Sequence, residues 1–87
     1  MIVSKSSATA WRIIEGEAVI ISLDTKIFRG LNAVGSRVWE LIDGRRSVDE
    51  IVEVIVREFD VTREQAAGDV QAFVRELLDK GLVTSAG

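Results

Sequence analysis

The spacing of apolar residues changes once along this chain of 87 residues, and the change separates an extended half from a helical half. Up to residue 31 the pattern is that of strands, with Val19, Ile21 and Leu23 on one face of a predicted strand. From residue 32 to residue 80, apolar residues recur at the spacing of an α-helix. A chain of this length fits one domain. The pattern therefore predicts an α+β fold in which the strands precede the helices.

Turn signals divide the first half into three strands, over residues 9–14, 17–23 and 26–31. Glu15 and Gly16 are predicted to form a tight turn, since glycine supplies the positive φ that such a hairpin needs. Asp24 and Thr25 supply the second turn. Short turns predict an antiparallel meander, and its first and third strands are then the edges of the sheet.

Capping signals begin three helices in the second half. Asn32 is a good N-cap for a helix over residues 33–42. A serine at residue 47 and a threonine at residue 62 each stand three residues before Glu or Gln, which is the capping-box spacing. The helices that they begin reach about residues 59 and 80. The order β-β-β-α-α-α is typical of a winged helix-turn-helix-like domain.

The ends of the chain carry weaker signals. Residues 1–8 are rich in serine and are predicted to be a flexible N-terminal arm before a domain over residues 9–87. Residues 82–83 are predicted to pack back as a short extended tail. No apolar run approaches the about 20 residues of a membrane-spanning helix, and the arm lacks the apolar stretch of a secretory signal. We therefore expect a cytoplasmic protein with no membrane partner.

The composition excludes many kinds of catalytic site. Cysteine and histidine are absent, which rules out zinc fingers, iron–sulfur sites and Ser-His or Cys-His nucleophile pairs. The acidic residues stand at helix starts or on polar helix faces, and neither a calcium loop nor a glycine-rich phosphate loop is present. We therefore expect no catalysis, no metal and no cofactor.

Net charge argues against nucleic acid as a partner. The formal charge is −3, whereas binding to nucleic acid depends on neutralising phosphates with Lys and Arg. The third helix, which would be the recognition helix of a winged helix, has more acidic than basic residues: Glu64, Asp69, Glu76 and Asp79 against Arg63, Arg75 and Lys80. A winged-helix nucleic-acid-binding regulator remains the alternative to a peptide-binding module.

The third predicted strand has an unpartnered edge with little to protect it. It contains no proline, and Lys26 and Arg29 are its only charges. An extended peptide can add to such an edge as a further strand, and an amphipathic helix beside it would wall a groove. Other readings are an ordinary edge with a bulge at Gly30, or an interaction subunit that pairs with a second copy as a homodimer. Phe73 on the third helix fits a core position better than a pocket position.

One stretch resembles a known family. The segment Leu31-Asn32-Ala-Val-Gly-Ser-Arg-Val-Trp-Glu-Leu-Ile-Asp-Gly44 is similar to the signature of the PqqD-like family. Segments 47–51, 59–61 and 81–83 fit the same family. The resemblance extends from about residue 11 to residue 83. Its motifs are structural more than chemical, so they point to the family more specifically than to one pathway.

The resemblance implies a RiPP precursor peptide recognition element. Such domains bind the leader peptide of a ribosomally made precursor by β-strand addition and present it to a modifying enzyme, such as a radical-SAM enzyme or a protease. The pathway is left open between pyrroloquinoline quinone, a lasso peptide and other products.

The resemblance also implies a peptide-binding site on the third strand and the third helix, at Lys26, Ile27, Phe28, Arg29, Gly30, Ala66, Asp69, Phe73 and Glu76. The strand residues would pair through their backbone, and the helix residues would border the peptide. Apolar leader residues would enter near Phe28 and Phe73, and acidic ones would be drawn to Lys26 and Arg29.

Overall fold

A computed structural model describes residues 1–85, and within them the chain forms five strands and three helices. Their bounds are β1 Val3–Lys5, β2 Thr9–Ile14, β3 Glu17–Ser22, β4 Phe28–Gly30, α1 Ala33–Leu41, α2 Val48–Glu58, α3 Arg63–Asp79 and β5 Val83–Ser85. The predicted order of three antiparallel strands and three helices is confirmed for β2 to α3, and so is the α+β class.

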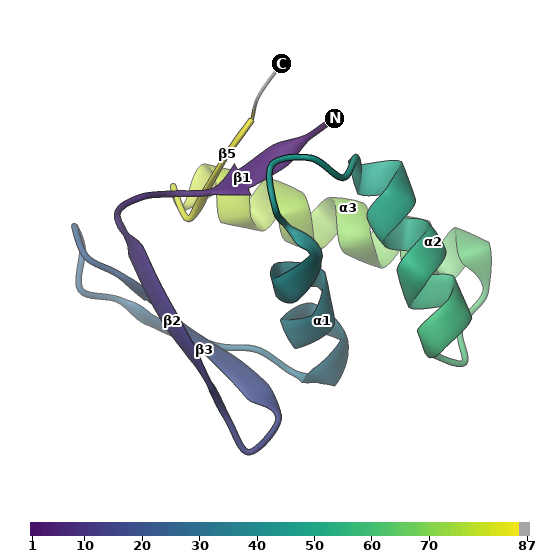
Figure 1. Ribbon diagram of the computed structural model, residues 1–87, viewed down its shortest axis with the longest axis horizontal. Helices are drawn as coiled ribbons and strands as arrows, with labels where there is room; N and C mark the ends of the chain where they lie inside the picture. Colours follow the sequence, from purple (N-terminus) through teal and green to yellow (C-terminus); the bar gives the residue numbers. More distant parts are fainter. Residues whose placement is uncertain (86–87) are drawn as a thin grey trace.

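Strands β2, β3 and β4 form one antiparallel sheet in that order. The hairpin between β2 and β3 closes at Glu15 and Gly16, with φ of 53° and 83°. Two successive residues with positive φ make the turn that matches the twist of the strands. In Figure 1 this hairpin extends away from the helices, which lie together on the other side of the molecule.

One face of the sheet is covered by helix α1. Along β3, Ala18, Ile20 and Ser22 are buried, whereas Val19 and Ile21 remain partly exposed on the opposite face. The Oγ of Ser36 in α1 accepts a hydrogen bond from the Ala18 N–H at 2.7 Å and donates one to the Leu31 carbonyl at 3.4 Å. This buried hydroxyl fastens both β3 and the residue after β4 to the helix.

The N-caps predicted for the three helices are confirmed, and of the two predicted capping boxes the one at Ser47 is complete. Asn32 accepts a hydrogen bond from the Gly35 N–H, and Thr62 accepts one from the Gln65 N–H. Ser47 and Glu50 form a reciprocal capping box at the start of α2. Each cap satisfies backbone donors that the first turn of a helix leaves unpaired.

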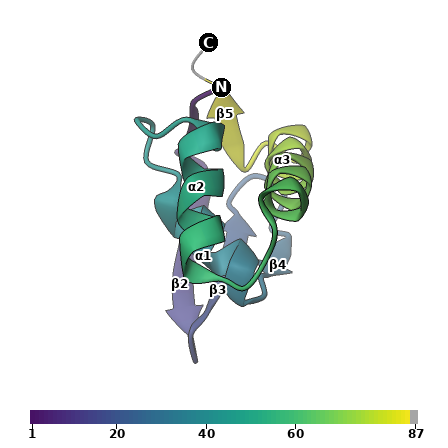
Figure 2. The same cartoon turned by 90° about the vertical axis from the view of Figure 1, so that its right-hand side faces the viewer.

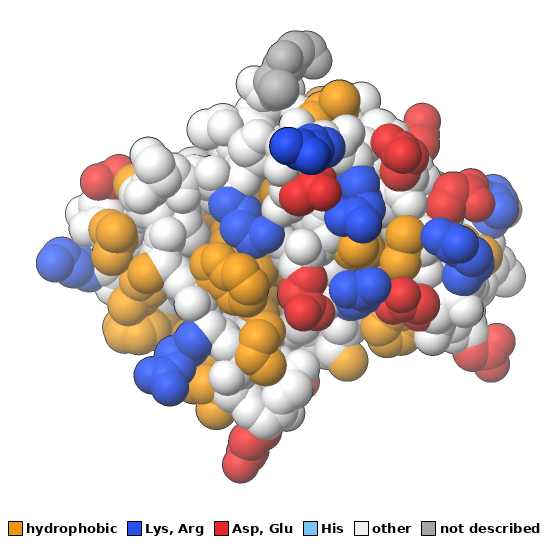
Figure 3. Space-filling model, viewed as in Figure 1, with side chains coloured by type: hydrophobic (Ala, Val, Ile, Leu, Met, Phe, Trp, Pro, Cys, Tyr) orange, Lys and Arg blue, Asp and Glu red, His pale blue; other side chains and the backbone are white. Residues whose placement is uncertain are grey.

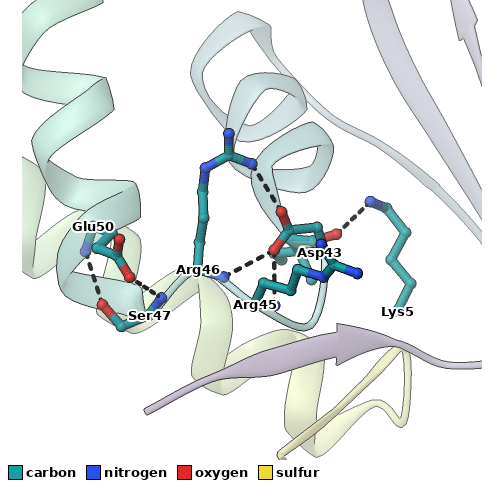
Figure 4. A network of polar contacts seen from close by, with 7 residues as sticks. Lys5, Asp43, Arg45, Arg46, Ser47 and Glu50 are labelled. Carbon is teal, nitrogen blue, oxygen red and sulfur yellow. Dashed lines mark hydrogen bonds and ion pairs between the residues drawn. The ribbon is translucent and has the colours of Figure 1, made fainter.

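The link between α1 and α2 is held by polar contacts from two sides (Figure 4). One carboxylate oxygen of Asp43 accepts the N–H groups of Arg45 and Arg46, both at 2.9 Å. These hydrogen bonds lower the pKa of Asp43 below its ordinary value. From the other side, Lys5 Nζ donates to the Ile42 carbonyl at 2.6 Å.

The N-terminal segment differs from the expectation of a flexible arm. Residues 3–5 form β1, which pairs antiparallel with β5 and so joins the two ends of the described chain. Val3 is fully buried. Lys5 lies 5.2 Å from the ring centres of both Trp11 and Trp39, and burial lowers its pKa. The pairing joins residues about 80 positions apart, so no local sequence pattern predicts it.

The third strand is shorter than predicted, because the turn before it is longer. Strand β4 begins at Phe28, whereas Lys26 and Ile27 belong to the turn. Lys26 has a φ of 61°, and its N–H bonds back to the Ser22 carbonyl at 2.8 Å.

Within residues 1–85, every helix is too short or too polar to cross a membrane.

We predict that Ser36→Ala destabilises the fold by about 1–3 kcal/mol, since it leaves the buried Ala18 N–H without a partner. The measurement is chemical denaturation of both proteins. Ser85→Ala, which removes an exposed serine hydroxyl, is the control and should change the free energy of unfolding little. Equal stabilities of the two variants would contradict this role of Ser36.

Candidate functional site

The outer edge of β4 carries backbone groups that point away from the sheet. The Ser22 N–H bonds to the Ile27 carbonyl at 3.0 Å, and the Leu31 N–H bonds to the Ala18 carbonyl at 2.9 Å. Hydrogen-bonded and non-hydrogen-bonded pairs alternate along an antiparallel ladder. The N–H and C=O groups of Phe28 and Gly30 therefore face outward, and no strand within residues 1–85 pairs with them.

The side chains of β4 alternate between the two faces of the sheet. Arg29 lies opposite the buried Ile20 and so points toward the helices. Phe28 lies opposite Ile21 on the other face, which we call the outer face, and 70% of its surface is exposed. Only Arg29 of these two residues can reach the space beside α3.

A pocket of about 590 Å³ opens beside this edge. Figure 2 shows α3 on the same side of the molecule as β4, with α1 between the sheet and α2. Apolar side chains from the three helices and the link before α3 line the pocket: Val34, Val38, Ile55, Val61, Ala66, Val70 and Phe73. Polar side chains stand among them: Arg29, Asn32, Gln65 and Asp69. An apolar pocket with a few polar groups is the usual form of a binding site.

An ion pair connects β4 to α3 beside the pocket. The guanidinium of Arg29 contacts both carboxylate oxygens of Glu76, at 2.7 and 3.0 Å. Lys80 adds a second cation to the same carboxylate at 3.2 Å. The Nε of Arg29 is buried and has no hydrogen-bond partner in the described chain. Arg29 and Lys80 thus share the single carboxylate of Glu76, and the contact with Glu76 holds the Arg29 guanidinium against α3.

Phe73 is both a core residue and a pocket residue. It packs against the buried cluster while its ring lines the pocket. Gly35 on α1 lies close to it, since a Cβ at Gly35 would stand 3.7 Å from Cζ of Phe73 and 3.2 Å from Oδ1 of Asn32. Ala66 is buried in the pocket floor, and Asp69 is exposed beside it.

The structure brings some of the residues expected at the site together and separates others. Five of the nine line the pocket: Arg29, Gly30, Ala66, Asp69 and Phe73. Glu76 joins them through Arg29. Lys26, Ile27 and Phe28 do not line it. Apolar ligand residues were expected to enter near Phe28 and Phe73, and the structure places these two rings on different surfaces, Phe28 on the outer face and Phe73 in the pocket.

Sequence reasoning missed the contribution of α1 and α2 to the pocket. Val34, Val38 and Ile55 belong to apolar stripes that read as core. A stripe at helical spacing does not reveal where the packed helices part, so the sequence carried no signal for these residues.

Within residues 1–85, no cluster of three acidic, His or Cys side chains could hold a metal ion.

Comparisons with known proteins give the site a context. The family described as Coenzyme PQQ synthesis protein D (PqqD) matches residues 17–83. A PqqA binding protein of Gluconobacter oxydans (strain 621H) is 41% identical over 46 residues, and the match covers 53% of this chain and 48% of that protein. Another from Rhodopseudomonas palustris (strain BisB5) is 29% identical over 76 residues, and the match covers 87% of this chain and 66% of that protein. This chain thus spans about half to two thirds of these relatives.

Two solved structures are similar over nearly the whole chain. TbiB1 in complex with the TbiA(beta) leader peptide has a TM-score of 0.87 and 34% identity, and the match covers 97% of this chain and 98% of TbiB1. A lasso peptide synthetase B1 complexed with a leader peptide has a TM-score of 0.86, and the match covers 98% of this chain and 100% of that structure's chain. At 15% identity, the second shows likeness of fold alone.

We predict that reversing both charges of the Arg29–Glu76 pair restores part of the stability that reversing either charge alone removes. Each single variant, Arg29→Glu or Glu76→Arg, sets like charges together across the pocket edge. For a pair this exposed, the double variant should be more stable than the sum of the singles by about 0.5–1 kcal/mol. The measurement is denaturant unfolding in a double-mutant cycle at low salt, and additive effects would show that the pair contributes no coupling.

Proposed function

Because this chain belongs to the PqqD family, we propose that it binds the leader peptide of a ribosomally made precursor, as an added strand on the outer edge of β4. Relatives carry the name PqqA binding protein, and TbiB1, at 34% identity, has been solved with a leader peptide. The binding mode is recognition by β-strand addition, in which the ligand's backbone supplies affinity and pockets for its side chains supply specificity.

One observation carries the proposal: the free edge of β4 lies beside an apolar pocket. Phe28 and Gly30 offer two N–H and two C=O groups to a peptide backbone. A peptide residue opposite Arg29 would then point toward α3, into the pocket that Phe73 lines. Backbone pairing and side-chain capture thus become available to the same extended segment.

We further propose that the chain acts without catalysis and presents the bound leader to a modifying enzyme, such as a radical-SAM enzyme or a protease. The sequence has neither cysteine nor histidine. A peptide added to β4 is held along one side only, so residues beyond the paired segment extend past the domain toward a second protein. The precursor belongs to a pyrroloquinoline quinone, lasso-peptide or other RiPP pathway.

Direct binding tests the proposal. A fluorescently labelled TbiA(beta) leader peptide and labelled PqqA are each titrated with the protein, and anisotropy is recorded. We expect saturable binding of at least one peptide, and a scrambled peptide of the same composition should bind more weakly. Failure of both peptides to bind above the scrambled control would overturn the proposed function.

The strand-addition mode makes a sharper prediction at Gly30. Gly30→Pro removes an N–H that points away from β3, so it should weaken binding of the leader by about three- to tenfold, the scale of one hydrogen bond. Gly30→Ala keeps this N–H, and its Cβ would meet no atom within 4 Å. The alanine variant should bind within about twofold of the wild type.

Circular dichroism and thermal unfolding of both Gly30 variants establish that they are folded. Wild-type affinity in a folded Gly30→Pro protein would count against pairing at this edge. Equal weakening by proline and alanine would also contradict it, since the backbone donor would then not be the cause.

A further inference from the structure

The exposed large apolar side chains are concentrated on the sheet and on the turn before β4. Six of the seven within residues 1–85 lie between residues 11 and 28: Trp11, Ile13, Ile14, Leu23, Ile27 and Phe28. In Figure 3 orange surface gathers over the hairpin side of the molecule, whereas red and blue cover much of the helical side. Phe28, with 70% of its surface exposed, is the most exposed of them. Its position on β4 places it at the edge where the peptide is proposed to bind.

The outer face of the sheet is built of rows that cross the strands. Ala10, Ile21 and Phe28 are paired in register and form one apolar row, which ends at Phe28. The neighbouring row runs through Val19 and ends at Gly30. A strand added to β4 lengthens both rows, because the residues opposite Phe28 and Gly30 project from the same face.

Gly30 leaves room on this face. A Cβ at Gly30 would meet no atom within 4 Å, so the end of the Val19 row is open space. Large side chains on a neighbouring strand, aromatic ones above all, cover such a glycine and shield its backbone from water. The row thus has a vacancy that a bulky side chain of an added strand would fill.

We propose that the outer face of β4 is a second subsite for the same peptide. One apolar side chain of the peptide packs beside Phe28, and a large apolar or aromatic side chain two residues away covers Gly30 and Val19. The residue between them turns into the pocket beside α3. The inference rests on the proposed function and deepens it, since the peptide is read on both faces of the sheet.

Continuity with the β4 edge favours the peptide over other occupants of this face. The peptide that pairs with Phe28 and Gly30 must place alternate side chains on the outer face, whatever its direction. A second copy that packed face to face on this sheet would also cover Ile14 on the distant strand β2. The two occupants therefore differ in how they depend on Ile14.

The test compares Phe28→Ala with Ile14→Ala, using the TbiA(beta) leader peptide as the probe. Both residues are exposed on the outer face, but β3 separates Ile14 from the peptide. Phe28→Ala should weaken binding about tenfold, through the lost cross-strand contact and the area it buries, whereas Ile14→Ala should stay within about twofold. Thermal unfolding of both variants should remain near that of the wild type.

An alanine scan of the peptide then locates the subsite. With the wild-type protein, alanine at either of the two peptide positions on the outer face, which are two residues apart, should weaken binding. With Phe28→Ala, alanine at the peptide position beside residue 28 should no longer weaken binding. Alanine at the position between the two should weaken it as much as before. This loss of sensitivity at one position separates direct contact from a general effect of hydrophobicity.

Each outcome decides between the alternatives. Unchanged affinity of Phe28→Ala for a peptide that binds the wild type would overturn the second subsite and leave the proposed function standing. Equal loss in both variants, with a dimer by analytical ultracentrifugation that each variant weakens, would assign the face to self-association and overturn the inference. A peptide that fails to bind the wild type would overturn the inference together with its premise.

Discussion

The position of β4 depends on a single buried hydroxyl and the ladder that it secures. Ser36 bonds Ala18 and Leu31, which are themselves hydrogen-bonded to each other across the ladder. This contact holds the sheet on α1, and the register of the ladder decides which groups of β4 are already paired. Because the Ile27 carbonyl and the Leu31 N–H bond to β3, the backbone N–H and C=O groups of Phe28 and Gly30 face outward. Register thus decides which backbone groups line the edge of β4, and the strand order leaves that edge without a partner strand within residues 1–85.

The same register decides what each side chain of β4 does. Arg29 turns toward α3 and forms the ion pair with Glu76, so the edge strand and the last helix are joined at one end of the pocket. Phe28 turns to the face without helices and stays exposed. Two neighbouring residues therefore serve different surfaces, and a strand added beside them would contact both surfaces through alternate residues. Backbone affinity and side-chain selection are separable in such a site.

Much of the fold was predictable from the sequence, because its signals are local. Asn32, Ser47 and Thr62 cap the three helices as predicted, and the Glu15–Gly16 turn joins β2 to β3. The candidate site was predictable only in outline, as an edge strand beside the third helix. Which residues of that strand point inward is set by its register with β3, which places Arg29 opposite the buried Ile20. The left-handed φ of Lys26 delays the start of the strand by two residues, although lysine gives no sign of it.

The amino-acid sequence by itself determined the kind, order and approximate limits of the strands and helices from residue 9 to residue 80, since periodicity and capping act within a few residues. Only the tertiary structure decided the rest. It paired residues 3–5 with residues 83–85, opened a pocket among stripes that read as uninterrupted core, and sent Phe28 and Arg29 to opposite faces. These features depend on contacts between segments distant in the chain, and local patterns do not record them.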